Sequence, residues 1–401
     1  MENALKRSRI GPIVLALLGL ALLLLPFFAA AAPATKEFRK EIPSKPGLVV
    51  VLENLAGRVT VEGKGDGPVE ILATIHAGSD QLLAELPIDV VENGGRIEVT
   101  ARYPIDTYDV FRYGGTEEKT SLFGRSSTST TYLGRRVKVV SGGSGGTELW
   151  ADFHLRIPPG TGVIVRNEVG RVSAASVAGP LTARTGTGAV RIEGGEGETK
   201  VRSGSGDVTV NGRKGSVEAD TGSGDVAIQN VAGPLSVGTG SGNASIEGVT
   251  GTVSAHTGSG DVKLKSVEGE RVKVRTGSGE IQLIDVKASL DAGTGSGGIR
   301  GDELVISGAL TADTGSGSIG LSGDFGALTE AQVGTSSGDV SLRMAKAPGM
   351  SLRCRTSSGD IDVDLAGTKV RSERQLEIAV GGGGVPVKIH TSSGNIRLEG
   401  K

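Results

Sequence analysis

Aliphatic residues alternate with polar or small residues on both sides of a glycine-rich phrase that recurs from residue 167 onward. The phrase is Thr-Gly-Ser-Gly or a close variant, and its copies start at Asn167, Thr185, Ser203, Thr221, Thr239, Thr257, Thr276, Thr294, Thr314, Thr335, Thr356 and Thr391. The first five steps between copies are 18 residues each, and the later steps are 19, 18, 20, 21, 21 and 35 residues. Alternation with a period of two predicts short strands with one buried face. A fixed repeat of this length is typical of a solenoid.

The aliphatic positions lie at fixed distances from the phrase. They stand five and seven residues after its first residue, as at Val226 and Ile228, and four and two residues before it, as at Leu235 and Val237. Each repeat therefore supplies two strands, and stacked repeats pair in parallel at a spacing of about 4.8 Å. We predict an all-β fold, a parallel β-solenoid with about 18–21 residues per coil and internal aliphatic ladders.

The same alignment makes predictions about single positions. The two glycines of each phrase are expected to adopt positive φ and so reverse the chain. Cys354 stands at a ladder position, so we expect a small buried side chain rather than a reactive thiol. Gly301 interrupts the ladder seven residues after Thr294, which predicts a local irregularity.

Three sections of the chain are expected: residues 1–32, an N-terminal β section at 45–165, and solenoid repeats at 166–401. The β section contains an aromatic-rich insertion at 103–147. We predict its strands at 48–52, 58–61, 69–75, 88–91 and 96–101, with one or two helical turns at 79–86.

Similar residues connect the two larger sections. The segment 53–59 is similar to 167–172, so the first strands are expected to begin the same solenoid. At the other end, Gly381 to Gly384 predict a hairpin insertion, and the copy at Thr391 predicts a closing coil.

Composition agrees with a narrow core. Of the 401 residues, 66 are Gly and only 3% are aromatic, whereas an ordinary α/β enzyme core uses aromatic side chains for packing. Lys and Arg total 43 against 45 for Asp and Glu, a net charge of −2 that predicts no nucleic-acid-binding surface. The single cysteine excludes an intramolecular disulfide and a cysteine metal cluster.

Residues 1–32 have the pattern of an export signal. Lys6, Arg7 and Arg9 precede an apolar run from Ile10 to Phe28, and four alanines follow. This order is typical of a cleaved signal peptide, but the run is also long enough for an uncleaved membrane anchor. In both cases we expect export to the periplasm or cell surface, with membrane contact only through residues 10–32 if they remain.

The repeats resemble the bacterial putative-adhesin family of β-strand-repeat proteins, a domain family of unknown function. The resemblance rests on the Thr-Gly-Ser-Gly-Asp-Val phrases, on the lead-in Phe153 to Gly160 and on the ending Thr391 to Ile396, and it covers roughly residues 45 to 401. It implies a parallel β-solenoid in the cell envelope. It supplies no catalytic residues.

An acidic column is the weaker of two candidate sites. Asp recurs four residues after the start of the phrase, at Asp207, Asp225, Asp261, Asp339 and Asp360. Gly-Ser-Gly-Asp is similar to the calcium-binding β-roll repeat, but that repeat occupies both halves of each coil and here the second half lacks it. We therefore expect each Asp to accept backbone N–H groups of its own turn, with no metal ligand and no cofactor.

The aromatic insertion is the stronger candidate. The candidate binding residues are Tyr108, Phe111, Tyr113, Phe123, Tyr132 and Trp150. Rings on a loop carried by a rigid scaffold can stack on sugars or anchor a protein partner. The alternative is a flap whose rings cover the open first coil of the solenoid.

Catalytic residues are not predicted. Arg166, Arg184 and Arg202 are expected to stack in neighbouring coils, a column that could attract an anion such as an acidic glycan. The four histidines (His76, His154, His256 and His390) are scattered through the sequence without metal-ligand spacing.

We therefore expect a non-catalytic envelope protein that binds a cell-surface glycan or an envelope protein through repeated polar faces. A glycan-cleaving β-helix enzyme is one alternative. A signalling or stress module that binds one protein partner is the other.

Overall fold

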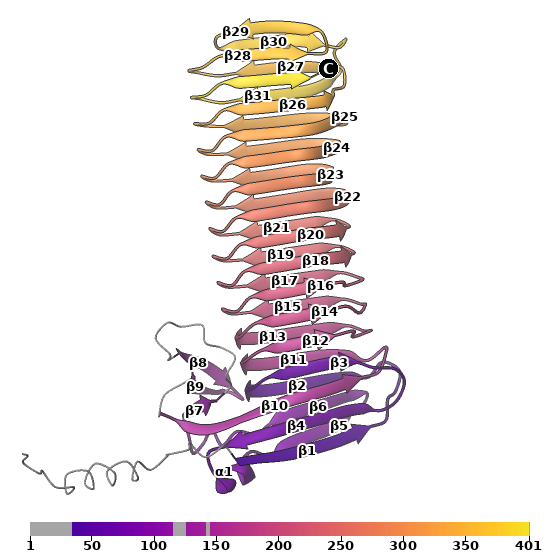
Figure 1. The fold of residues 1–401 in the computed structure, drawn as a ribbon, viewed down its shortest axis with the longest axis vertical. Helices are drawn as coiled ribbons and strands as arrows, with labels where there is room; N and C mark the ends of the chain where they lie inside the picture. The colour runs from indigo at the N-terminus through magenta and orange to yellow at the C-terminus, as the bar shows by residue number, and fades with distance from the viewer. Residues whose placement is uncertain (1–33, 115–125, 142–144, 401) are drawn as a thin grey trace, which may run out of the picture. The chain divides into compact units, whose positions relative to one another are not determined.

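Each 18-residue repeat forms one coil of two strands, and the coils lie one above another in the computed structural model (Figure 1). β13 (Leu181–Thr187) pairs in parallel with β15 (Thr199–Ser203), and β14 (Val190–Glu193) pairs in parallel with β16 (Val208–Asn211). The following coils consist of β17 (Val217–Thr221), β18 (Val226–Ala232), β19 (Leu235–Thr239), β20 (Ala244–Thr250), β21 (Val253–Thr257), β22 (Val262–Thr276), β23 (Ile281–Thr294), β24 (Ile299–Thr314), β25 (Ile319–Thr335) and β26 (Val340–Lys346). The predicted parallel β-solenoid is confirmed.

The structure describes residues 34–114, 126–141 and 145–400. The expected signal segment at 1–32 and the candidate Phe123 lie outside these residues. Among the described residues, no helix has the length and apolar character needed to cross a bilayer.

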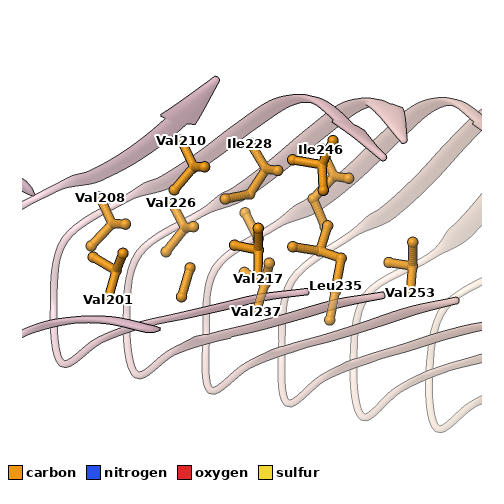
Figure 2. Close-up of a cluster of buried hydrophobic side chains, with 14 of the residues drawn as sticks. Val201, Val208, Val210, Val217, Val226, Ile228, Leu235, Val237, Ile246 and Val253 are labelled. Carbon is orange, nitrogen blue, oxygen red and sulfur yellow. The ribbon is translucent and has the colours of Figure 1, made fainter. Parts of the chain in front are cut away.

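Aliphatic ladders fill the inside of the coils. Val210, Ile228 and Ile246 stand opposite one another on successive coils, and Val208 and Val226 form the neighbouring row (Figure 2). Ile228, Ile246 and Leu264 are all 0% exposed. Because burying one such side chain stabilises a fold by roughly 1.5–3 kcal/mol, the ladders supply much of the stability of the coils.

The phrase glycines are needed for a reason other than the predicted one. At Gly222, Gly224, Gly240 and Gly242, φ lies outside the positive region, so the prediction of positive φ is wrong there. A Cβ on Gly242 would instead lie 1.9 Å from the carbonyl oxygen of Gly224 in the coil below, and one on Gly240 would lie 2.3 Å from that of Gly222. Close stacking of the turns therefore excludes every side chain at these positions.

Positive φ occurs at the opposite corner of the coil. Asn230, Ser266, Asp285 and Glu303 have φ between 51° and 57°. These residues occupy equivalent places in their coils, so one left-handed residue turns the chain there in each of these four coils.

The single-position predictions for Cys354 and Gly301 are confirmed. Cys354 is 0% exposed, and burial raises the pKa of its thiol to about 12. The pairing of β24 with β25 shifts register between Gly301 and Leu304, and the Leu304 side chain lies where a Cβ of Gly301 would be.

The N-terminal strands continue the solenoid. β2 (Val49–Ala56) and β3 (Val59–Gly63) pair in parallel with β11 (Gly162–Val169) and β12 (Val172–Ala175), with Asn54 opposite Asn167. The two similar sequence segments therefore lie in adjacent coils. β6 (Arg96–Ala101) and β10 (Thr147–Ile157) form one further parallel layer.

Antiparallel strands follow beyond that layer. β4 (Val69–Ala77) pairs with β10 and with β1 (Ala34–Ile42), and β5 (Ile88–Asn93) pairs with β6. The predicted helical turn is α1 (Asp80–Ala84), where the Ser79 side chain accepts the N–H of Leu82. The insertion forms β7 (Val110–Tyr113), β8 (Ser126–Tyr132) and β9 (Arg135–Ser141); β9 pairs in parallel with β7 and antiparallel with β8.

The order of the last coils differs from their order in the sequence. β31 (Val385–His390) lies between β25 and β27 (Met350–Arg355), and β32 (Ile396–Gly400) lies between β26 and β28 (Ile361–Leu365). The prediction of a closing coil at Thr391 is therefore wrong, because this coil is followed in space by an earlier one. The end is formed by β29 (Thr368–Ser372) and β30 (Gln375–Val380), which pair antiparallel with β28 and β27.

Gly242→Ala is expected to lower the free energy of unfolding by at least about 3 kcal/mol, because the backbone of two coils must move apart. Gly65→Ala is the control, since no atom lies within 4 Å of its Cβ position. Urea denaturation of both variants measures the difference. Equal midpoints would show that turn stacking does not require glycine.

The Cys354 thiol is expected not to react with a thiol reagent at pH 8 in the folded protein and to react fully in denaturant. The folded protein holds the thiol proton more tightly than the unfolded chain, whose thiol titrates at about 8.5. The associated stability is complete below that pH and declines as the pH rises towards 12. Cys354→Ala should remove this part of the alkaline destabilisation, and labelling of the native protein at pH 8 would contradict the assignment.

Candidate functional site

The acidic column connects neighbouring coils. The N–H of Asp225 donates to Oδ1 of Asp207 (3.0 Å), and the N–H of Asn243 donates to Oδ1 of Asp225 (2.7 Å). Asp261 accepts the N–H of Glu280 in the same way (2.8 Å). The expectation that each Asp serves its own turn is therefore wrong in detail, because the side chain reaches the backbone of the next coil.

The same arrangement recurs near the C-terminal end. The N–H of Asn395 donates to Oδ1 of Asp339 (2.7 Å), and the N–H of Asp360 donates to Oδ1 of Asn395 (3.0 Å). Asparagine replaces aspartate here because either side chain offers the accepting oxygen. Among the described residues, no group of three or more His, Cys, Asp or Glu side chains is placed to hold a metal ion.

The first residue of each phrase forms a second column inside the coils. Oγ1 of Thr257 donates to the carbonyl of Gly242 in the coil below (2.9 Å) and accepts the N–H of Gly260 in its own turn (3.1 Å). Asn167 and Asn54 continue this column, with Asn54 Nδ2 donating to Asn167 Oδ1 (3.0 Å). The hydroxyls are buried and therefore do not face a ligand.

The insertion aromatics lie in the core beneath the first coils. Phe111, Tyr113, Tyr132 and Trp150 are between 0% and 8% exposed. The Tyr103 ring meets Phe111 and Tyr132 edge to face, at 5.4 and 5.8 Å between centroids. Such packing supports the cap interpretation for these four rings, since buried faces cannot stack on a ligand. Tyr108 is half-buried and packs edge-on to Phe111.

Tyr103 connects the cap to the internal polar column. Its hydroxyl donates to the carbonyl of Ala56 (2.8 Å) and accepts the N–H of Ala151 (3.1 Å). It also lies 3.2 Å from Oδ1 of Asn54. Burial raises the pKa of Tyr103 well above its ordinary value, so the phenol stays protonated and donates at any ordinary pH.

The predicted arginine column is present, but acids compensate most of it. Arg166, Arg184 and Arg202 stand opposite one another in adjacent coils. Arg166 pairs with Glu53 (2.5 Å), and Arg202 pairs with Glu218 (2.7 Å). Two of the three charges are therefore neutralised, which weakens the column as a site for an acidic glycan.

Two histidines have carboxylate partners that sequence spacing did not indicate. His76 lies 3.3 Å from Asp152 and stacks on the Trp150 ring, and His154 lies 3.1 Å from Glu62. The Asp152 carboxylate also accepts the N–H of Arg58 (2.7 Å). These contacts join strands of the N-terminal section.

Arg213 is a buried residue that sequence reasoning missed. It is 0% exposed, and its guanidinium donates to the carbonyls of Val177 (2.5 Å) and Gly179 (2.9 Å) and to Oγ1 of Thr199 (2.6 Å). Its Nη1 lies where a Cβ of Gly195 would be. Burial lowers the pKa of Arg213, and the carbonyls offset that cost. The sequence did contain a signal. Gly195 and Arg213 stand one repeat apart at a corner position that valine usually fills, as at Val231.

The best candidate site is a groove on the outer face of the C-terminal coils. It consists of two hollows of about 620 and 410 Å³ that share Asp339 and Ser341. We call their combined lining the outer groove: Glu280, Gly298, Arg300, Ser318, Ile319, Gly320, Asp339, Val340, Ser341, Asp360, Ile361, Asp362, Arg371, Ser372, Glu373, Asn395, Ile396 and Arg397.

Small residues form the floor of the outer groove. Gly320 on β25 stands opposite Ser341 on β26, and Gly298 and Ser318 directly precede β24 and β25. These four positions offer no long side chain, whereas Arg300 on β24 stands opposite Gly320. At one end β29 pairs antiparallel with β28 as the next strand of the sheet, and Arg371, Ser372 and Glu373 line the hollow there. The sequence could not reveal this part of the lining, because it depends on an antiparallel return of the chain.

Charges in the outer groove are mixed, with an acidic excess. Five acidic and three basic residues line it, which gives −2. Glu280 pairs with Arg300 (2.8 Å) and Asp362 with Arg371 (3.3 Å). The carboxylates of Asp360 and Glu373 have no partner among the described residues. The groove is therefore suited to neutral or cationic polar groups rather than to anions.

The C-terminal part of the chain matches a known family. Residues 229–399 match the family model described as Toastrack DUF4097, which confirms the predicted family resemblance over those residues. No curated protein matches the chain.

Two crystal structures are similar at low identity. One is of a putative cell adhesion protein from Clostridium sporogenes ATCC 15579, with 10% identity and a TM-score of 0.16, covering 92% of this chain and 100% of that one. The other is of a putative adhesin from Bacteroides fragilis NCTC 9343, with 11% identity and a TM-score of 0.22, covering 91% of this chain and 98% of that one.

Calorimetric titration with Ca²⁺ is expected to give no saturable heat, because four of the five aspartates of the column already accept a backbone N–H: Asp207, Asp225, Asp261 and Asp339. Asp225→Asn keeps the accepting oxygen and should change stability by less than about 0.5 kcal/mol, whereas Asp225→Ala should cost about 1 kcal/mol. Saturation at several ions per chain, lost in Asp225→Asn, would instead establish the calcium site.

Proposed function

We propose that this protein is an exported, non-catalytic binding scaffold that holds a linear glycan without acidic groups along the outer groove. The observation that carries this proposal is that the two hollows of the outer groove share Asp339 and Ser341 and together span successive coils. A ligand lying along the solenoid axis meets one set of polar side chains every roughly 4.8 Å, the coil spacing. A chain of sugar units is a ligand of matching, repeated chemistry.

The groove chemistry supports a polar ligand. Hydroxyl groups of sugars both donate and accept hydrogen bonds, and the lining offers carboxylates, guanidinium groups, hydroxyls and the Asn395 amide. No aromatic residue lines either hollow, so each sugar unit contributes little alone. Binding therefore has to accumulate over several units, which favours long ligands.

The signal pattern of residues 1–32 supports export to the envelope. A glycan at a cell surface would be accessible to an exported protein. The carboxylates of Asp360 and Glu373, which have no basic partner among the described residues, repel acidic polysaccharides. They therefore also count against the alternative of an enzyme that cleaves acidic glycans.

Calorimetry with a neutral chito-oligosaccharide of six units should detect binding that oligogalacturonate of the same length does not show. Gly320→Phe is expected to weaken this binding at least about tenfold, or 1.4 kcal/mol, by filling the groove. The Cβ position of Gly320 has no atom within 4 Å, so the fold should tolerate the ring.

Ala227→Phe is the matched control, because Ala227 stands in the equivalent outward column on β18, outside the groove. Equal binding by both variants, or no binding by the wild type, would refute the groove as the site. A reducing-end assay on the same mixtures tests the enzyme alternative, and release of shorter sugars would overturn the non-catalytic assignment.

A further inference from the structure

The last coil in the sequence is the second-last coil in space. β31 and β32 fill a layer between β25–β26 on one side and β27–β28 on the other (Figure 1). Val387 stands opposite both Ala331 and Leu352, and Ile396 stands opposite both Val340 and Ile361. Residues 385–400, which we call the inserted coil, therefore pair along both edges of both strands.

The coil beyond this layer has other partners. β27 pairs antiparallel with β30, with Cys354 opposite Leu376, and β28 pairs antiparallel with β29, with Val363 opposite Val370. These hairpin pairs involve no residue of the inserted coil. Without that coil, two facing sheet edges would remain, separated by roughly 10 Å, or two strand spacings. Such edges are templates for any chain of complementary pattern.

A glycine segment joins the inserted coil to the rest. Gly381, Gly382, Gly383 and Gly384 have φ of 60°, 89°, 80° and 129°. Glycine reaches these and many other backbone angles at little cost, so the segment can act as a hinge. It passes Gly349, where a Cβ would lie 2.5 Å from the carbonyl oxygen of Gly383.

We propose that the inserted coil exchanges between two copies of this chain, so that each copy completes the layer of the other. The exchanged coil remakes the same contacts, including the bond from Thr391 Oγ1 to the Gly338 carbonyl (2.9 Å) and that from Thr356 Oγ1 to the Gly394 carbonyl (2.9 Å). The change in contact energy is therefore close to zero, and concentration decides between the two forms.

Exchange would place residues of one copy in the outer groove of the other. Asn395, Ile396 and Arg397 belong to the inserted coil and line the groove. Each groove of the dimer would thus combine residues of two chains and would lie at a shared tip. This consequence depends on the proposed function, whereas the exchange itself does not.

Only four residues link Val380 to Val385. In dilute solution each chain therefore fills the layer with its own inserted coil. A short flexible link gives an effective concentration in the millimolar range. Exchange should therefore be slight at about 10 µM and reach a large fraction near about 1 mM, a density that only crowded or surface-attached chains reach.

Cross-linking of full-length chains tests the proposal. Gln332 and Lys388 are exposed and stand opposite each other on β25 and β31. A mixture of Gln332→Cys and Lys388→Cys chains, concentrated and then oxidised, is expected to form a disulfide between copies only when the inserted coil has exchanged, since neighbouring strands lie within disulfide reach. Cys354 is buried and does not interfere.

A mixture of Ser236→Cys and Ser254→Cys chains is the matched control. These residues are exposed neighbours on β19 and β21, in coils that have no hinge. The double variant Gln332→Cys/Lys388→Cys should cross-link within one chain, which verifies the geometry. We expect at least about a fivefold excess of linked dimer over the control near 1 mM, and about the control level at 10 µM.

The proposal would be overturned if the double variant cross-links within one chain but the mixture gives no more linked dimer than the control at either concentration. Deletion of Gly382 and Gly383 gives a second measurement. The shortened link cannot return across two layers, so light scattering should show a stable dimer, and a folded monomer would also count against the proposal. Neither measurement involves glycan binding. A negative result would therefore count against the exchange of the inserted coil and not against the proposed function.

Discussion

The solenoid depends on the contact between glycine turns of successive coils. A carbonyl of one turn lies so close to the glycine above it that even a methyl group has no room, as at Gly224 and Gly242. The same turn begins with a buried hydroxyl, such as that of Thr257. This hydroxyl donates to a carbonyl of the coil below and accepts a backbone N–H of its own turn. These two features fix the height and register of each coil, and the aliphatic ladders and outward columns follow from that register. The abundance of glycine thus has a steric cause.

Most of the fold follows from residues close together in the sequence. The spacing of Val226, Ile228, Leu235 and Val237 predicted two strands per coil and the ladders, because side-chain direction alternates along a strand. The reason for the glycines could not be derived in the same way. A tight turn within one coil and a close contact between two coils both require glycine. Only the three-dimensional structure distinguishes the two reasons.

The candidate site was less predictable than the fold. The aromatic residues of the insertion form a cap with Tyr103 at its centre, and burial distinguishes this role from ligand binding. The outer groove depends on the strand that brings Arg371 to Glu373 beside β28 and on the late insertion of Asn395 and Arg397. The first is an antiparallel return and the second is a parallel pairing out of sequence order, and no repeat pattern contains either. Arg213 was missed because its partners belong to two preceding coils.

The coils tolerate differences in length at one corner only. In the 19- to 21-residue coils the turn residues Thr276, Thr294, Thr314 and Thr335 stay opposite one another. The register shifts all fall at the other corner, for example between Glu268 and Arg271 and between Ala288 and Leu290. Extra residues therefore leave the coil there without disturbing the stack above or below. That corner is where variants of this chain can acquire new loops, and where a peptide could be grafted at a chosen height along the solenoid.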